Sequence, residues 1–420
     1  MAVEAQGNRS FFRRLRTNKN AFAILMFEPM FGIPYNLFIP YFTLYMTKLG
    51  CTPEQVGLIG TVGMVFQMIF SLLAPPITDR LGRNRTTVIF DVISWSGGIL
   101  LWIFAGNFWF FLIAAVIQSI NRVVNVSWTC LLVEDTDKDL LVTIFSWITI
   151  AGLLSAVFSP LAAGFVKQLT VVPAMRWLLA IAFVLMTAMF FLRNAFTKET
   201  TIGRARMAQA RTKPVLSQAM AVFGVAGDVW RNKKTLLFFI LTAVYSAALV
   251  VKGPYFALLI TEALHFTDET AGYFAAASSG VMLVIYLFAQ PLLTRFLPKA
   301  PLAVGLALCA VGSCILLIPQ QTLAANLIAV ILSVVITAAG TAVAQPFIDG
   351  LSHGSIDNEK RSGMTSILVA FTLFVNAPFG WLGGKLYEIN ARLPFAAASA
   401  LFIVSVVLLS VFYKNEKPAV

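Results

Sequence analysis

The sequence predicts an all-α membrane protein with twelve transmembrane helices in two pseudo-symmetric six-helix bundles. Of its 420 residues, 59% are hydrophobic and only 12% are charged, about half the charged share of a typical soluble domain. Apolar runs of about 20 residues, the length that crosses a bilayer as a helix, recur along the whole chain. The pattern of the first half also returns in the second half.

Twelve apolar runs can be read along the chain, each bounded by polar or turn-forming residues. They are expected at 21–46, 55–77, 87–106, 108–133, 141–166, 174–195, 235–260, 270–293, 301–319, 323–348, 363–384 and 393–413. Gly106 and Asn107 form a turn that separates the third run from the fourth. The predicted division is a basic tail (1–20), an N-terminal six-helix bundle (21–195), a basic linker (196–234), a C-terminal six-helix bundle (235–413) and a second tail (414–420).

The distribution of Lys and Arg predicts the orientation of the helices. With the N-terminus in the cytoplasm, 24 of the 31 basic residues fall in cytoplasmic segments and five fall in outer loops. Cytoplasmic loops of membrane proteins carry such an excess, so both termini and the linker are predicted to be cytoplasmic, at the plasma (inner) membrane. Within the linker, residues 215–230 form either an amphipathic segment on the membrane surface or a solvated connection.

The two halves carry matching local sequences at an offset of 214–215 residues. Residues 40–44 (PYFTL) return as 254–258 (PYFAL), and residues 76–80 (PITDR) return as 291–295 (PLLTR). Two parallel repeats of six helices, joined by a basic linker, suit alternating access to a solute site at the midplane.

The loop after the second run reads PPITDRLGRNR, from Pro75 to Arg85. It resembles the signature between helices two and three of the major facilitator superfamily, and the twelve-helix repeat extends this resemblance over the whole chain. The residues that match the signature are Asp79, Arg80, Gly82, Arg83 and Arg85, whereas Pro75 and Asn84 depart from it.

The resemblance implies a carrier of small solutes and leaves the solute open. It also implies that this motif forms a cytoplasmic gate, in contact with acidic residues such as Glu134 and Asp135, while the carrier faces outward. The alternative is an ordinary charged loop that only sets the topology. We favour the gate, because Asp79 is an acid in a loop that topology alone would make basic.

Charges inside a hydrocarbon span are costly unless they are paired or face water. Glu28 in the first run and Arg122 in the fourth lie at similar depths, so they are predicted to form a buried pair that couples transport to protons, with a permanent structural salt bridge as the alternative. Lys252 either contacts substrate or extends to the interface. Asp91 is expected to be interfacial and structural.

The family resemblance implies that helices one, four, seven and ten line a central cavity. The polar and aromatic residues on those runs are therefore cavity candidates together with Lys252: Tyr35, Asn36, Gln118, Asn121, Asn125, Trp128, Tyr245 and Gln345. Such a lining suits a sugar or an amphiphilic organic compound equally.

Other function classes find little support in the sequence. The net charge of +12 would suit a nucleic-acid partner, but the basic residues stand in short runs between apolar stretches, so none is expected. The four cysteines and two histidines form no metal-ligand or catalytic spacing, so no metal, cofactor or catalytic residue is predicted. We expect a secondary transporter, taking up a sugar-type solute or exporting an amphiphilic one, coupled to protons and working as a monomer in the bilayer. A non-transporting receptor or sensor and a membrane enzyme are the alternatives.

Overall fold

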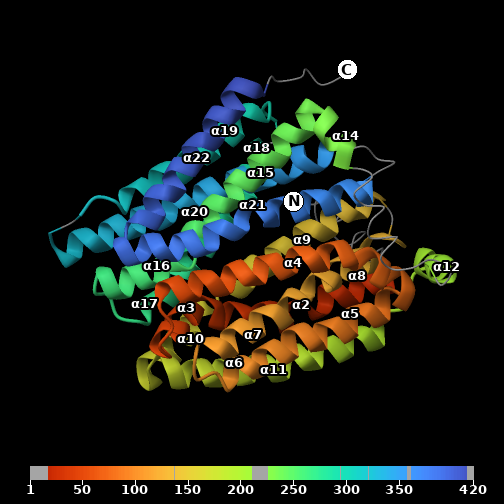
Figure 1. The fold of residues 1–420 in the computed structure, drawn as a ribbon, viewed down its shortest axis with the longest axis horizontal. Helices are drawn as coiled ribbons and strands as arrows, with labels where there is room; N and C mark the ends of the chain where they lie inside the picture. Colours follow the sequence, from red (N-terminus) through yellow and green to blue (C-terminus); the bar gives the residue numbers. More distant parts are fainter. Residues whose placement is uncertain are drawn as a thin grey trace, which may run out of the picture.

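The computed structural model describes residues 18–136, 138–210, 226–293, 295–319, 321–356 and 361–413. Most of the predicted 1–20 tail, the whole 414–420 tail and residues 211–225 of the linker lie outside the described residues, so the amphipathic hypothesis for the linker is largely untested. The described chain is helical (Figure 1).

Six spans form the first half of the molecule, and several of them consist of consecutive helices. Their elements are α2 (Lys19–Phe38), η1 (Ile39–Tyr41), α3 (Phe42–Lys48), α4 (Pro53–Leu81), α5 (Arg83–Asp91), η2 (Val92–Ser96), α6 (Gly97–Ile103), α7 (Phe108–Ser119), α8 (Asn121–Val133), α9 (Lys138–Ala156), α10 (Ser159–Leu169) and α11 (Val171–Phe196). In the described part of the linker, two short helices follow, α12 (Thr201–Ala210) and α14 (Ala226–Arg231).

Six further spans form the second half. Their elements are α15 (Lys233–Lys252), α16 (Tyr255–Leu258), η3 (Leu259–Ala263), α17 (Thr270–Val284), η4 (Ile285–Ala289), α18 (Gln290–Leu293), α19 (Lys299–Ile315), α20 (Leu323–Gly354), α21 (Arg361–Ile389) and α22 (Leu393–Phe412). In Figure 1 the red-to-yellow helices of the first half lie below the green-to-blue helices of the second half.

The predicted fold class is confirmed. Eleven spans in the described residues are long and apolar enough to cross a membrane, and α19 is a shorter apolar helix at the place of the ninth predicted run. The predicted turn between the third and fourth runs is also present, where Asn107 caps α7 by accepting a hydrogen bond from the amide of Trp109 at 3.1 Å.

Local sequence explains where several spans begin. Thr52 and Gln55 form a capping box at the start of α4, with Thr52 Oγ1 accepting from the Gln55 amide at 3.2 Å and Gln55 Oε1 accepting from the Thr52 amide at 3.0 Å. Pro53 occupies the first turn of α4, where a missing N–H costs nothing. Asn232 is the N-cap of α15, and its side-chain oxygen accepts hydrogen bonds from the amides of Lys234 and Thr235.

Because the spans run alternately up and down, the bundle has two ends. The linker end holds α12 and α14. It also holds the first and last described residues, since Asn18 bonds to Asp135 after α8 and Tyr413 bonds to Lys299 at the start of α19. The far end holds the loops at 49–52, 104–107, 264–269 and 390–392. These two names are used below.

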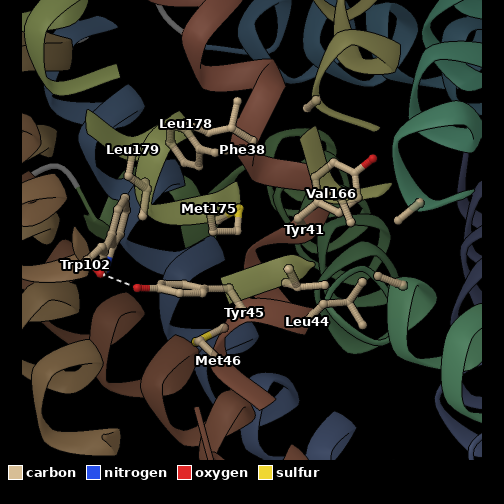
Figure 2. Close-up of a cluster of buried hydrophobic side chains, with 14 of the residues drawn as sticks. Phe38, Tyr41, Leu44, Tyr45, Met46, Trp102, Val166, Met175, Leu178 and Leu179 are labelled. Atoms are coloured by element: carbon tan, nitrogen blue, oxygen red, sulfur yellow. Dashed lines mark hydrogen bonds between the residues drawn. The ribbon is translucent and has the colours of Figure 1, made fainter. Parts of the chain in front are cut away.

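The far-end core of the first half is aromatic (Figure 2). Tyr41 and Tyr45 are completely buried, and the phenol of Tyr45 donates a hydrogen bond to the carbonyl of Trp102 at 2.7 Å. The rings of Phe42 and Trp102 lie 4.5 Å apart. Hydrogen-bonded phenols and tilted ring pairs stabilise such a core beyond the area that they bury.

The two halves meet most closely where α4 packs along α21. A methyl group on Gly57 would overlap the carbonyl oxygen of Gly380, and one on Gly384 would overlap the backbone at Pro53. The side chain of Thr61 bridges the same seam, since its hydroxyl donates to the carbonyl of Ala377 at 2.6 Å. Small residues therefore allow direct backbone contact between the halves, as is usual between helices in membranes.

Candidate functional site

A cavity of about 610 Å³ lies between the two halves. The first half contributes residues of η1, α3, α4, α6 and α7, and the second half contributes residues from α15 to α17, from α20 and from the start of α22. Cavities of this size hold small organic ligands. The walls thus come from both halves, and a rotation of one half against the other would change the shape of the cavity.

The lining is mostly apolar and aromatic. Its rings belong to Phe42, Trp102, Phe111, Phe256, Phe274 and Phe395, and its polar side chains belong to Thr43, Gln67, Gln118, Lys252, Ser278, Ser333 and Thr337. Lys252 is the one charged side chain in this lining among the described residues. A mixture of an apolar wall and a few polar groups is typical of small-molecule sites.

Contacts between the halves join them at the far end. The phenol of Tyr41 donates to the carbonyl of Glu269 at 3.0 Å and accepts from the amide of Gly272 at 3.1 Å. The phenol of Tyr255 lies 3.4 Å from the carbonyl of Pro53. These contacts join η1 to α17 and α16 to the start of α4.

Two ion pairs cross the same end. Lys385 Nζ lies 2.5 Å from Glu54 Oε2, and Trp381 Nε1 donates to the other oxygen of that carboxylate at 2.9 Å. Lys48 Nζ lies 3.5 Å from Asp268 Oδ2. These pairs are partly exposed, so each adds little to stability. Their position still makes them contacts that must break if the far end opens.

Two of the nine predicted cavity residues, Gln118 and Lys252, line this cavity. The other seven, Tyr35, Asn36, Asn121, Asn125, Trp128, Tyr245 and Gln345, do not belong to its lining. Tyr35 packs between Phe31 and Trp95, at ring distances of 5.8 and 5.7 Å. Tyr245 is 2% exposed and packs on Phe402 inside the second half.

The remaining five are placed as follows. The Asn36 amide bonds to the carbonyl of Gly32 at 2.8 Å, and Trp128 packs in a small cluster near the linker end. Asn121 is partly buried and Asn125 is exposed on α8. Gln345 donates to both carboxylate oxygens of Asp349 at 2.9 Å. Helix assignment alone did not tell which face of each helix looks into the cavity.

The predicted pair between Glu28 and Arg122 is absent from the described residues. Arg122 instead donates two hydrogen bonds to Gln67 Oε1, from Nε at 2.8 Å and from one terminal nitrogen at 2.6 Å. Gln67 lines the cavity, whereas Arg122 does not. Arg122 therefore orients a cavity residue from outside the lining. Gln67 was missed because it is a single amide in the apolar run of α4, without a pattern that marks it.

Glu28 faces a different pair of charges. The charged groups close enough to act on it are Arg193 on α11 and Asp91 on α5. Arg193 and Asp91 form an ion pair, and they are only 6% and 3% exposed. Asp91 is therefore buried within the bundle in a structural ion pair, because the long side chain of Arg193 reaches back into the bundle from the end of α11.

The packing around this triad explains its arrangement. Phe31 follows Glu28 by one turn of α2, Trp95 follows Asp91 by about one turn, and their rings meet at 5.0 Å. Glu28 and Asp91 therefore face each other one turn nearer to the linker end. The π-helix η2 starts directly after Asp91, and π-helical turns interrupt helices most often at functional positions. We call Glu28, Asp91 and Arg193 the buried triad.

The predicted gate residues form a network at the linker end of the first half. Arg83 binds Asp79 at 2.8 Å and Glu134 at 2.9 Å, and Thr200 donates to Glu134 as well. Asp135 accepts from the amide and the hydroxyl of Thr201 at 3.2 and 2.5 Å. The network ties α4, α5 and α8 to the beginning of the linker.

The remaining motif residues frame this network. Gly82 adopts a φ of +84°, and a methyl group there would overlap the Glu199 carboxylate and the Met207 sulfur. The same carboxylate accepts from the amide of Asn84 at 3.1 Å, at the N-terminus of α5. Arg80 makes contacts of its own, and Arg85 is exposed.

Comparison with known proteins points to one family. A family model described as Major Facilitator Superfamily matches residues 29–254 and 238–420. A curated relative described as a probable 3-phenylpropionic acid transporter, from Escherichia coli (strain K12), is 31% identical over 77 residues. That match covers 16% of this chain and 20% of the relative, so the chain matches only about a fifth of that protein's length.

Solved structures share the whole fold at low sequence identity. The nucleoside transporter NupG superposes with a TM-score of 0.67 at 15% identity, over 94% of this chain and 100% of that one. The D-xylose-proton symporter gives 0.72 at 13% identity, over 96% and 98%. The human organic anion transporter MFSD10 (TETRAN) gives 0.65 at 15% identity, over 93% and 99%.

Proposed function

Since the chain belongs to the Major Facilitator Superfamily and is a secondary transporter of small-molecule solutes, we propose that it carries a small organic solute by alternating access, coupled to protons. It is an integral membrane protein. The proposal adds that it acts as a monomer in the plasma (inner) membrane with both termini cytoplasmic.

The cavity between the halves is the observation that carries this proposal. It has walls from both halves, and Tyr41, Tyr255 and the Glu54–Lys385 pair join the halves at the far end. In alternating access, rocking of two repeats exposes a site at their interface to one side and then to the other. Opening the far end requires that these contacts break.

The excess of basic residues favours a cytoplasmic linker end. With that orientation, the far end, where contacts join the halves, is the outer end, and we infer an inward-facing state. The Arg83 network would then serve as part of the inner gate, and it would meet the second half only in the outward-facing state. In the present state, Arg83 binds Asp79 and Glu134, and Glu134 binds Thr200 of the linker, so the network stays within the first half and the linker.

The buried triad supports Glu28 as the residue that couples transport to protons. Two carboxylates lie near one guanidinium, which pairs directly with Asp91, so the cluster carries a net charge of −1 when both carboxylates are ionised. Binding of one proton neutralises it, and a buried net charge is costly in a bilayer. Arg193 binds Asp91 directly, which leaves Glu28 as the acid that most readily takes up the proton. Its partner is thus this ion pair rather than Arg122.

Uptake into proteoliposomes tests the proposal. With an imposed pH gradient and a panel of sugars, nucleosides, peptides and organic acids, at least one solute should accumulate. Glu28→Gln keeps the shape of the side chain but cannot titrate, so it should abolish accumulation driven by the pH gradient while solute counterflow survives. Asp349→Asn is the matched control, because it removes an acid from a span of the other half.

Each contrary result has a distinct meaning. If Glu28→Gln accumulates solute with normal pH dependence, Glu28 is not the coupling residue. If Asp349→Asn alone abolishes accumulation, coupling resides in the second half. If several ligands bind but none is transported under any gradient, the protein is a receptor rather than a carrier.

The names of similar proteins do not select the solute. They cover a phenylpropionic acid, nucleosides, D-xylose and organic anions, and the structural matches are too distant to transfer more than the fold. The choice must come from the chemistry of the cavity itself.

A further inference from the structure

Lys252 places a positive charge at the cavity wall with few partners. Its ammonium group donates to Ser313 Oγ at 3.0 Å and lies 5.2 Å from the centre of the Phe402 ring. An ammonium has three N–H donors, and Ser313 accepts only one of them. The hydroxyl of Ser313 itself donates to the carbonyl of Cys309 at 2.9 Å.

The described residues provide no carboxylate that pairs with Lys252. The acids of the second half that have identified contacts are engaged elsewhere: Glu262 with Tyr387, Asp268 with Lys48, Asp349 with Gln345, and Glu388 with the amide of Glu54. A charge in an apolar span is costly unless an opposite charge or water accompanies it. The cavity is the place from which such a partner can reach Lys252.

A second polar group in the lining also lacks a partner. The hydroxyl of Thr337 is buried and makes no hydrogen bond within the described residues, although Thr337 lines the same cavity. Buried hydroxyls are nearly always hydrogen-bonded. Its neighbour Ser333 is already satisfied, because its hydroxyl donates to the carbonyl of Gly312 at 2.6 Å. The Thr337 hydroxyl faces Gly312 of α19 and is closed to the cavity, so an anionic group in the cavity would pair with Lys252.

The rest of the cavity favours an apolar body. Six aromatic residues contribute to its lining, while Gln67, one of its two amides, is already bound by Arg122. A sugar needs many hydrogen-bonding groups along its length, and leaving them unpaired in such a site is costly. A cationic solute would be repelled by Lys252. An organic anion with an aromatic or aliphatic body meets neither objection.

We propose that Lys252 binds the carboxylate of a small amphiphilic organic acid whose apolar body occupies the aromatic part of the cavity. This inference rests on the proposed transport function and specifies its substrate class. Ser313 and Phe402 hold the ammonium in place.

Binding measurements on the purified full-length protein test the inference without transport. The probes are arylalkanoic acids of increasing chain length and their uncharged amides, followed by isothermal titration calorimetry. At least one acid should bind more tightly than its amide by about 10-fold to 100-fold, the usual difference for a hydrogen bond to a charged group. Lys252→Met should reduce this ratio to less than about 2-fold, while Lys252→Arg should keep most of it.

Two further variants guard against trivial explanations. Lys167→Met removes an exposed lysine outside the cavity and should leave the ratio unchanged. Ser313→Ala leaves the charge but frees the ammonium, so it should lower acid affinity several-fold without affecting the amide. If Lys252→Met fails to fold, the Ser313→Ala result tests the inference in its place.

The inference is wrong if acids and amides bind equally to the unmodified protein, or if Lys252→Met retains the preference for acids. The two proposals fail separately. Transport of a neutral solute without binding of acids removes the inference and leaves the transport function. Binding of acids through Lys252, with no flux of any solute, leaves the anion site and removes the carrier function.

Discussion

The phenol of Tyr41 accepts a hydrogen bond from the backbone amide of Gly272 at 3.1 Å, and so joins the first span of one half to the second span of the other half. It also donates to the carbonyl of Glu269. We expect Tyr41→Phe to favour a state with an open far end. A typical hydrogen bond contributes about 0.5–1.5 kcal/mol, so the equilibrium should shift roughly 2-fold to 10-fold.

Tyr45→Phe is the matched control for this variant. Tyr45 is equally buried in the same span, but its phenol bonds to Trp102 within its own half. Spin labels at positions 167 and 265, on far-end segments of the two halves, report the opening as a longer distance by pulsed electron resonance. Tyr41→Phe should populate the longer distance and Tyr45→Phe should not. The same shift in both variants would mean that loss of any buried phenol hydrogen bond opens the far end, and that the bond between the halves has no special role.

The ion pair between Asp91 and Arg193 should be important for stability. Removing one partner of a buried pair leaves an uncompensated charge and costs about 3–5 kcal/mol. Asp91→Asn should therefore lower the unfolding midpoint in detergent markedly. Lys48→Met breaks a pair whose side chains are 47% and 30% exposed, and should cost less than about 1 kcal/mol. Equal losses in the two variants would mean that the triad is hydrated.

Gly82→Ala should destabilise the protein more than Gly50→Ala. Both glycines have positive φ, +84° at Gly82 and +91° at Gly50, and an alanine is strained at either position. Only at Gly82 would the added methyl group meet other atoms, those of Glu199 and Met207, whereas the space around Gly50 is open. Both variants carry the backbone strain of an alanine at positive φ, so the difference between their thermal unfolding midpoints measures the steric clash at Gly82. Equal midpoints would exclude that clash.

Cysteine labelling in intact cells tests the orientation. With the linker in the cytoplasm, Ala205→Cys should resist a membrane-impermeant thiol reagent and His265→Cys should react; the reverse result would invert the topology. Both positions are exposed. Native Cys51 lies near the far end, but burial raises the pKa of its thiol to about 11, so it stays neutral and reacts slowly at pH 7. The variants are best compared with the unmodified chain.

Most of the fold could be predicted because one physical requirement dominates it. A span must satisfy its own backbone in lipid, so a long apolar run becomes a helix wherever it occurs. The run at 301–319 is the partial exception, since α19 ends at Ile315 and is shorter than the other spans. The gate network was also accessible from sequence, because Asp79 and Arg83 are four residues apart on facing helix ends and Glu134 ends α8.

The interior charges were harder to place. Hydropathy gives the depth of a residue along its helix but not the direction in which its side chain points around the axis. Glu28 and Arg122 have similar depths, yet Glu28 points toward Asp91 and Arg122 toward Gln67. Arg193 was not singled out from the sequence, because it stands at the end of an apolar run, where basic residues are common. Its reach into the bundle depends on side-chain length and on a partner three spans away in the same half.

The glycine seam between α4 and α21 has a mechanical consequence. Where Gly57 meets Gly380, the two backbones touch directly beside the hydrogen bond from Thr61 to Ala377, so this point can act as a fulcrum near the far end. Leu81, at the other end of α4, lies roughly 36 Å along the helix from Gly57 at 1.5 Å per residue. A tilt of about 10° at the fulcrum would then displace that end by roughly 6 Å. The lever arm thus converts the loss of a few far-end contacts into a large change of aperture at the opposite membrane surface.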